Sequence, residues 1–174
     1  MVATRLDVWY RYNATSFSIS PRPKKEFTIR SCGREQWNKF RKYHYLNTEI
    51  ANACQCFGLY DKNNIIGFIG ILHQPNSFNK KYKRVSRLVI LPDYQGIGLG
   101  TKFLDIVARY YINKGYDFGI VTSAKNLINA LRKKDNWYLF AYEKSRHTNN
   151  GSIDSLRKVR DECYTARFKY KRKW

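Results

Sequence analysis

The chain has 174 residues, of which 43% are hydrophobic and 16% aromatic, so it is long enough for one domain with a real core and is not disordered by composition. It carries 33 Lys and Arg against 13 Asp and Glu, a formal net charge of +20. An enzyme of small neutral molecules has no physical need for this charge, which favours a polyanionic partner.

The N-terminal half predicts short strands around one helix. Phe17–Ile19 and Glu26–Arg30 each favour a short strand. The segment Glu35–Leu46 predicts a helix, because large apolar side chains recur there at spacings of three and four. A hairpin follows, made of a strand at Cys54–Leu59, a turn at Asp61–Asn64 and a strand at Ile65–Leu72.

The C-terminal half alternates strands and helices. A strand at Val85–Leu91 leads through a glycine-rich turn into a helix that runs to about Asn113, and Gly115 ends that helix. The elements predicted after it are a strand at Asp117–Thr122, a helix at Asn126–Lys133, a strand at Trp137–Tyr142 and a helix at Ser152–Arg160. This order predicts a single α/β domain over 1–174, with a mixed central sheet and basic extensions at about 1–25 and 145–174.

The turn after Leu91 is the most informative motif. A β-branched strand enters Gln95-Gly96-Ile97-Gly98-Leu99-Gly100, and an apolar-periodic helix follows. The first amides of a helix have no internal partner, its dipole favours an anion, and glycines let a phosphate approach. The motif lacks the Gly-Lys-Ser/Thr of a P-loop, and its glycine spacing differs from the dinucleotide fingerprint. An ordinary glycine turn is the alternative interpretation.

Gln-x-x-Gly-x-Gly after a strand resembles the acyl-CoA-binding motif of the GNAT acetyltransferases. The resemblance covers about residues 26–142 and implies a sheet with helices on both faces, splayed at the acyl-CoA site. It implies acetyl-CoA or another acyl-CoA as cofactor, with loop amides on the pyrophosphate and the preceding strand beside the pantetheine arm. The implied cofactor-binding residues are Leu88, Val89, Ile90, Leu91, Gln95, Gly96, Ile97, Gly98, Leu99, Gly100 and Thr101.

No apolar stretch is long enough to span a bilayer, and no signal peptide is visible at the start of the chain. We therefore expect a soluble cytoplasmic protein with no membrane partner, in a bacterial or phage-infected cell. The four cysteines do not form a disulfide framework. Cys54-x-Cys56 is too closely spaced for a structural zinc pair, so buried free thiols are expected and no metal is predicted.

The positive charge is grouped along the chain. Cations flank the first predicted helix, fill the loop before the motif strand, and alternate with aromatic residues in Arg167–Trp174. Such interleaving is typical of segments that contact nucleic acid, although a solvated tail has the same composition. The predicted nucleic-acid-binding residues are Arg41, Lys42, Lys81, Lys83, Arg84, Arg87, Arg167, Lys169, Lys171, Arg172 and Lys173.

The expected acid of an acetyltransferase is missing. GNAT enzymes often place a Tyr, then Gly-Phe, in and after the helix that follows the fifth strand. Here Asn126 and the apolar helix are present, but the Tyr is absent and Trp137 stands near the Gly-Phe position. Other groups must then move the proton of the attacking amine or orient the acyl group.

Three residues are the candidate catalytic groups. His44 and Tyr45 end the first predicted helix, where an imidazole could carry a proton near neutral pH and an aromatic ring could stack on a base. A packed core histidine is the alternative for His44. Ser123 leaves the fifth strand beside the expected thioester position; its alternative role is the N-cap of the next helix.

These departures form a second resemblance. Trp37-x-x-Phe40-x-x-Tyr43-His44-Tyr45-Leu46, the stretch from Ser86 to Gly96, Thr122-Ser123 and Trp137 are similar to the Mom-type branch of the GNAT superfamily. Proteins of this bacteriophage branch convert the exocyclic amine of adenine in DNA to a carbamoylmethyl derivative, which blocks restriction. The resemblance implies base modification of nucleic acid, with DNA favoured over RNA.

Two alternatives stay open. One is an acetyl-CoA-dependent N-acetyltransferase acting on tRNA, aminoacyl-tRNA or a basic protein. The other is a non-catalytic nucleic-acid-binding module, against which the intact glycine loop argues. The sequence also leaves the oligomeric state open, a homodimer included.

Overall fold

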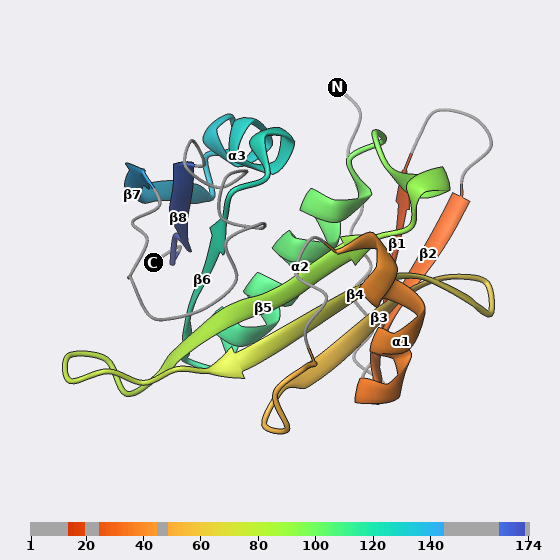
Figure 1. Cartoon of the computed structure of the whole chain (residues 1–174), viewed down its shortest axis with the longest axis horizontal. Coiled ribbons are helices and arrows are strands. Elements are labelled where there is room, and N and C mark those ends of the chain that lie inside the picture. Colours follow the sequence, from red (N-terminus) through yellow and green to blue (C-terminus); the bar gives the residue numbers. More distant parts are fainter. Residues whose placement is uncertain (1–13, 20–24, 45–48, 145–163, 173–174) are drawn as a thin grey trace, which may run out of the picture. The chain divides into compact units, whose positions relative to one another are not determined.

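The structure is a computed structural model, which describes residues 14–19, 25–44, 49–144 and 164–172 (Figure 1). The chain divides into two compact units. The first comprises Met1–His73 with Val85–Val107, and the second comprises Gln74–Arg84 with Ala108–Trp174. The expectation of one domain over 1–174 stays a prediction, and each unit is described by itself.

The first unit contains a sheet whose strands lie in chain order. They are β1 (Ala14–Ile19), β2 (Lys25–Cys32), β3 (Gln55–Asp61), β4 (Asn64–His73) and the part of β5 (Tyr82–Ile90) from Val85 onward. The pairs β1–β2, β2–β3 and β3–β4 are antiparallel. Every strand predicted in this part of the chain is confirmed, with ends displaced by a few residues.

The first predicted helix is shorter than expected. In place of one helix over 35–46, the structure has a 3₁₀ turn at Arg34–Gln36, α1 (Trp37–Phe40) and a second 3₁₀ turn at Arg41–Tyr43. Residues 45–48 lie outside the described part of the chain. The spacing of three between Trp37 and Phe40 is still informative, because both side chains are buried and a single turn is enough to place them.

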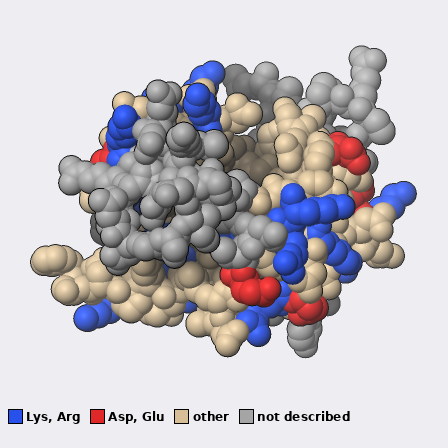
Figure 2. All heavy atoms as spheres, in the orientation of Figure 1, with Lys and Arg blue, Asp and Glu red and all other residues tan. Residues whose placement is uncertain are grey.

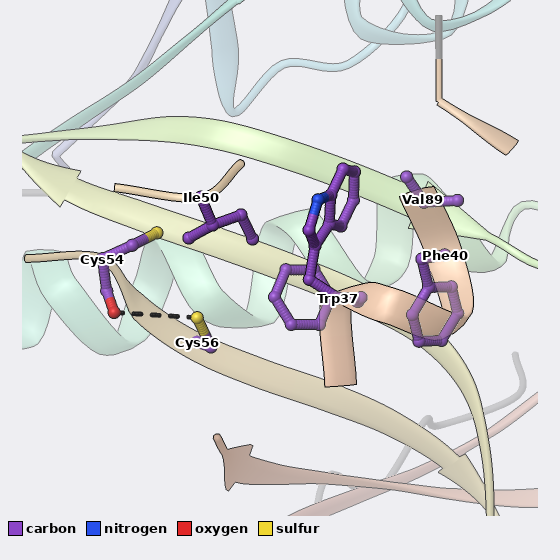
Figure 3. Packing of buried hydrophobic residues seen from close by; sticks show 7 residues of the cluster. Trp37, Phe40, Ile50, Cys54, Cys56 and Val89 are labelled. Carbon is purple, nitrogen blue, oxygen red and sulfur yellow. Dashed lines mark hydrogen bonds between the residues drawn. The ribbon is translucent and has the colours of Figure 1, made fainter. Parts of the chain in front are cut away.

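Trp37 and Phe40 belong to a cluster of buried hydrophobic residues in the first unit (Figure 3). Their rings lie 5.6 Å and 5.8 Å from that of Phe68 on β4. Cys54 and Cys56 are buried in the same cluster as free thiols, as predicted, and Cys56 Sγ donates to the Cys54 carbonyl at 3.6 Å. No group of His, Cys, Asp or Glu among the described residues is arranged to hold a metal ion.

The second unit is built on a sheet of three antiparallel strands in the order β6-β8-β7. Its elements are β6 (Asp117–Thr122), α3 (Lys125–Arg132), β7 (Trp137–Lys144) and β8 (Tyr164–Tyr170). The first three confirm their predictions, and β6 has the predicted bounds. The helix expected at Ser152–Arg160 lies outside the described residues.

Strand β8 corrects the prediction of a basic C-terminal extension. Residues 164–170 are the central strand of this sheet, hydrogen-bonded to both β6 and β7. Ala166 and Phe168 are fully buried, whereas Arg167 is exposed. The segment alternates apolar and basic residues because one face of the strand packs in the core and the other does not.

The helix α2 (Leu99–Asn113) carries the glycine motif at its start. Leu99, Phe103 and Leu104 are buried within the first unit, and Tyr111 stacks on Phe118 within the second unit with ring centroids 5.7 Å apart. The helix ends before Gly115, whose φ of +79° is the left-handed conformation expected there. None of the helices described by the structure is long and apolar enough to cross a membrane.

Candidate functional site

The start of the loop between β5 and α2 is fixed to the first unit. The Leu91 amide donates to the Ile66 carbonyl of β4 at 2.8 Å, just where β5 ends. A 3₁₀ turn over Pro92–Tyr94 follows, and the Tyr94 hydroxyl donates to the Asp61 carboxylate at 2.9 Å. These contacts give the loop a defined starting point, and nothing in the sequence motif points to the Tyr94–Asp61 pair.

Gln95 makes two hydrogen bonds to residues that precede it in the loop and at the end of β5. Its main-chain amide donates to the Pro92 carbonyl at 3.0 Å, and its side-chain Nε2 donates to the Ile90 carbonyl at 2.7 Å. The side chain therefore ties the start of the glycine segment back to the end of β5. This contact accounts for the glutamine before the glycines. Its side-chain amide reaches the Ile90 carbonyl, whereas a shorter or apolar side chain could not donate a hydrogen bond to it.

Two of the three glycines in the motif have a backbone conformation that favours glycine. Gly96 and Gly98 have φ of +83° and +81°, a left-handed conformation that residues with a Cβ rarely adopt. A Cβ at either position would project into open space, with no atom of the chain within 4 Å. Gly100 differs from them, because its φ is not positive and a Cβ there would make an ordinary van der Waals contact, 3.5 Å from Ile90 Cγ1.

The start of α2 presents main-chain amides beside that open space. The first helical hydrogen bond runs from the Lys102 amide to the Gly98 carbonyl at 3.1 Å, and Thr101 Oγ1 donates to the same carbonyl at 2.9 Å. The amides of Leu99, Gly100 and Thr101 thus precede the first residue bonded within the helix. In a helix of 15 residues the dipole adds positive potential at this end. A diphosphate fits this cradle chemically, because side chains are missing where it would sit and N–H donors face it.

The remaining predicted cofactor-binding residues, Leu88 to Leu91, lie in and just after β5, ahead of the glycine loop. Val89 and Ile90 are buried in the first unit, and Leu88 and Leu91 are half-buried. Ile97 is exposed on the loop itself. Contact of this strand with a pantetheine arm stays a prediction.

His44 lies at the edge of the Trp37 cluster. It follows the second 3₁₀ turn, is half-buried, and its ring meets the indole of Trp37 edge-on at 5.5 Å. Both interpretations of His44 remain compatible with this placement, since one side of the ring packs on Trp37 and the residue is not fully enclosed. Tyr45 lies outside the described residues.

The guanidinium of Arg87 approaches Trp37 as well. Its central carbon lies 5.8 Å from the indole centroid, and Nη1 donates to the Ser86 carbonyl at 2.9 Å. The sequence predicts Arg87 on the nucleic-acid surface, but the residue is half-buried against the core cluster. His44, Trp37 and Arg87 therefore form one packed group on the first unit, which the sequence spacing alone could not indicate.

Ser123 is not the N-cap of α3. The N-cap is Ala124, whose amide donates to Thr122 Oγ1 at 3.1 Å. No side chain described by the structure makes a cap hydrogen bond to α3, so the capping role that the alternative interpretation gives Ser123 is wrong. Ser123 is half-buried between β6 and α3, and its predicted catalytic role is untested.

The predicted nucleic-acid-binding cations have different surroundings. In the first unit, Arg41 lies 4.0 Å from Glu49, and Lys42 lies over the ring of Tyr43. Both residues are exposed. These contacts at the surface are weak and leave both cations accessible to a polyanion.

In the second unit two of the predicted cations, Lys83 and Arg172, are held by neighbouring side chains. Lys83 lies between the rings of Tyr111 and Tyr116, 5.4 Å and 5.0 Å from their centroids, and desolvation by burial lowers its pKa. Arg172 makes a 2.8 Å ion pair with Asp117, which gives it a structural role that the sequence did not predict. Lys81 and Lys171 are exposed, Arg84 is half-buried, and Lys173 lies outside the described residues.

Comparison with known proteins establishes the family. A model described as the acetyltransferase (GNAT) family matches residues 20–132. The match covers more than half of the chain, and the chain belongs to the acetyltransferase (GNAT) family. None of the curated proteins compared with the chain matches it significantly.

Solved structures share the fold. An IAA acetyltransferase from Bacillus cereus ATCC 14579 is 14% identical, with a TM-score of 0.58 over 83% of this chain and 98% of that one. A GNAT family acetyltransferase from Elizabethkingia anophelis with acetyl-CoA bound is 13% identical, with a TM-score of 0.55 over 84% of this chain and 98% of that one. The ribosomal-protein-S18-alanine N-acetyltransferase from Escherichia coli is 14% identical, with a TM-score of 0.60 over 83% and 92%. The α/β class and the GNAT fold are thereby confirmed.

Proposed function

We propose that the chain transfers a group from an acyl-CoA to the exocyclic amine of a nucleic-acid base, adenine in DNA being favoured. The observation that carries the donor half of the proposal is the cradle at Gly96 and Gly98, where main-chain amides border a space that a Cβ would fill. Membership of the acetyltransferase (GNAT) family supports acetyl-CoA or a related thioester as the donor.

The charge of the molecule supports a polyanionic acceptor. The net charge of +20 exceeds what solubility requires, and Lys and Arg side chains predominate over acidic ones on the face shown in Figure 2. Lys and Arg that neutralise phosphates release counterions, which supplies most of the affinity of proteins for nucleic acid. A small neutral acceptor or an acidic peptide would not explain a charge of this size as well as a polynucleotide does.

The chemistry needs a base that leaves the stack and loses a proton. The lone pair of the adenine amine is delocalised into the ring, so the amine attacks a carbonyl carbon poorly unless a proton is removed as the N–C bond forms. The C–S bond of the thioester then breaks, and the proton returns to the leaving thiolate. We assign proton transfer to His44, placed beside Trp37 on the first unit, and orientation of the acyl carbonyl to Ser123. Enzymes that act on bases flip the target nucleotide out of the duplex.

The resemblance to the Mom-type branch gives the proposal its finer form. It rests on the residues from Trp37 to Leu46, on Ser86–Gly96, on Thr122-Ser123 and on Trp137, and it favours adenine in DNA over other acceptors. A second candidate acceptor is a basic protein, which the fold similarity to the S18-alanine N-acetyltransferase favours. Transfer to tRNA or aminoacyl-tRNA is grouped with this second candidate, because acetyl-CoA would again be the donor and only the acceptor would differ.

The test is expression of the chain in a bacterial host, followed by digestion of host DNA and tRNA to nucleosides for mass spectrometry. We expect a new adenosine-derived mass in DNA from cells with the wild-type chain and a smaller amount of it with Gly98→Ala, whose methyl group should weaken donor binding. The matched control is Gly115→Ala, which changes a glycine of the same φ sign outside the cradle and should preserve the new mass. A modified tRNA or ribosomal protein with unmodified DNA would contradict the DNA assignment.

A further inference from the structure

One face of the β6-β8-β7 sheet is exposed although it carries apolar side chains. The register aligns Gly119, Lys169 and Tyr138 in one row, and Val121, Arg167 and Ala141 in the next. Successive side chains of a strand alternate between faces, so all six belong to the same face. On the opposite face Ile120, Ala166 and Phe168 are buried.

The composition of this face, which we call the aromatic face, is unusual for a sheet surface turned to solvent. Tyr138 and Val121 are 41% and 37% exposed, and Phe140 is 57% exposed. The solvent side of an antiparallel sheet normally carries polar residues, and contiguous exposed apolar groups mark interaction sites.

A bulge sets the orientation of Phe140. The register between β7 and β8 shifts between Leu139 and Ala141, which leaves Phe140 without a partner in the ladder. Bulges re-aim a side chain in this way. The Lys169 ammonium lies 4.1 Å from the centroid of the Phe140 ring, which places the ring on the aromatic face beside a cation.

The aromatic face carries cations, and the acidic residues Glu143 and Asp117 near it are each paired with an arginine. Lys169 and Arg167 occupy its central strand, and Glu143 lies 3.6 Å from Arg167 in an exposed ion pair. Asp117, two residues before Gly119 on β6, makes a 2.8 Å ion pair with Arg172. Tyr82 extends this surface, because its hydroxyl lies over Gly119 in the space where a Cβ would be. Desolvation by burial, with the Asp117 carboxylate adding to it, raises the pKa of both Tyr82 and Tyr138.

We propose that the aromatic face binds an unpaired segment of the polynucleotide, with bases stacked on Phe140 and Tyr138 and phosphates beside Lys169 and Arg167. Exposed rings on a sheet can stack only on bases that are free of the duplex, whereas basic residues alone would serve duplex and single strand alike. The inference rests on the proposed function for the identity of the polyanion. It adds to that function a site that holds the nucleic-acid strand while one of its bases is out of the stack.

The test is fluorescence anisotropy with a labelled 12-nucleotide deoxyadenosine-containing oligonucleotide, single-stranded or paired with its complement, at one fixed salt concentration. The wild-type chain should bind the single strand more tightly than the duplex. Phe140→Ala and Tyr138→Ala should each weaken single-strand binding about tenfold, since stacking contributes about 1–3 kcal/mol per base. Duplex binding should change by less than about twofold.

Tyr164→Ala is the matched control, because Tyr164 is 48% exposed but lies on the opposite face of β8. It should bind both oligonucleotides as the wild type does. Thermal melting of each variant confirms that it is folded. Lys169→Ala should weaken both complexes, because a phosphate contact does not depend on pairing.

Equal binding of the single strand by wild type, Phe140→Ala and Tyr138→Ala would overturn the inference, as would a wild-type preference for the duplex. A loss of self-association in Phe140→Ala without any change in oligonucleotide binding would assign the face to a second copy of the chain and overturn it too. The proposed function fails separately, when nucleosides stay unmodified while single-strand binding still depends on the two rings.

Discussion

The side-chain amide of Gln95 donates a hydrogen bond to the main-chain carbonyl of Ile90 at 2.7 Å. This bond closes the glycine loop onto the end of β5 before any ligand binds. A loop held in its binding conformation loses less entropy when the ligand arrives, so the bond should contribute to affinity through preorganisation.

Gln95→Ala should therefore weaken binding of acetyl-CoA about fivefold, since a hydrogen bond of this kind contributes about 1 kcal/mol. Titration calorimetry measures the affinity directly. Gln55→Ala, at the exposed start of β3, is the control and should bind as the wild type does. Unchanged affinity in Gln95→Ala would show that the loop keeps its conformation without this contact.

Gly98→Ala and Gly115→Ala separate backbone strain from loss of the cradle. Both glycines have positive φ, and a Cβ at either would project into open space, so each alanine should cost about 1–2 kcal/mol of stability. Gly98→Ala should in addition lower acetyl-CoA affinity by about tenfold or more, because its methyl group enters the diphosphate space. If both variants bind acetyl-CoA as the wild type does, the cradle is not the donor site.

His44→Ala should lower the turnover rate about a hundredfold or more, the usual scale for a group that transfers a proton. Its melting temperature should stay near that of the wild type. Ser123→Ala should lower turnover without a change in melting, and His73→Ala, exposed at the end of β4, should have no effect.

The alternative for His44 predicts a different pair of results. If its only role is to pack on Trp37, His44→Ala should melt earlier and lose activity in proportion to the folded protein that is lost. Melting and turnover measured on the same preparation distinguish the two. A stable and fully active His44→Ala chain would remove this residue from the mechanism.

Phe168→Ala should destabilise the chain by about 3–5 kcal/mol, because the ring is fully buried on β8 and its removal leaves a cavity. Lys169→Ala, the next residue on the exposed side of the same strand, should change stability by about 0.5 kcal/mol or less. Urea unfolding followed by tryptophan fluorescence gives both values. Equal, small effects would mean that residues 164–170 are a peripheral tail after all.

Cys32 should make the stability of the chain fall at alkaline pH. Desolvation by burial, with Cys56 and Glu35 nearby, raises the pKa of the Cys32 thiol from 9.0 to about 12. The folded state then holds this proton more tightly than the unfolded state. The resulting stability is complete below pH 9 and is lost as the pH rises toward 12.

Cys32→Ala should therefore lose stability less steeply than the wild type above about pH 9, as measured by urea unfolding at several pH values. The comparison of slopes cancels the titration of the remaining tyrosines and lysines, which both chains share. Parallel slopes would show that the Cys32 thiol titrates alike in the folded and unfolded states.

The glycine turn and every strand except β8 are predictable from the sequence because they depend on local signals. Alternation of side chains and the conformational needs of glycine act over a few residues. Strand β6, for example, has the bounds that its pattern predicts. Strand β8 is harder to predict, because the residues that alternate around Ala166 and Phe168 also form a run of cations, which favours a solvated tail.

Other features of the site depend on contacts between distant segments. The Arg87 guanidinium lies over the Trp37 ring, and the Tyr94 hydroxyl donates to Asp61. The orientation of Phe140 depends on a bulge that forms where β7 pairs with β8. The helix expected over 35–46 breaks into short turns for the same reason. Burial of Trp37 and Phe40, rather than helix propensity, fixes this segment.

The most direct test of the proposed activity is transfer of label from acetyl-CoA carrying radioactive carbon in its acetyl group. The purified chain is incubated with single-stranded DNA, duplex DNA, tRNA and ribosomal protein in separate reactions, and the products are digested and resolved. With acetyl-CoA kept below its Kd for the wild type, we expect label in a deoxyadenosine-derived nucleoside with the wild type and with Gly115→Ala, and about tenfold less label or lower with Gly98→Ala. Label confined to protein or to the aminoacyl group of tRNA, or undiminished labelling of DNA by Gly98→Ala, would contradict the proposed activity.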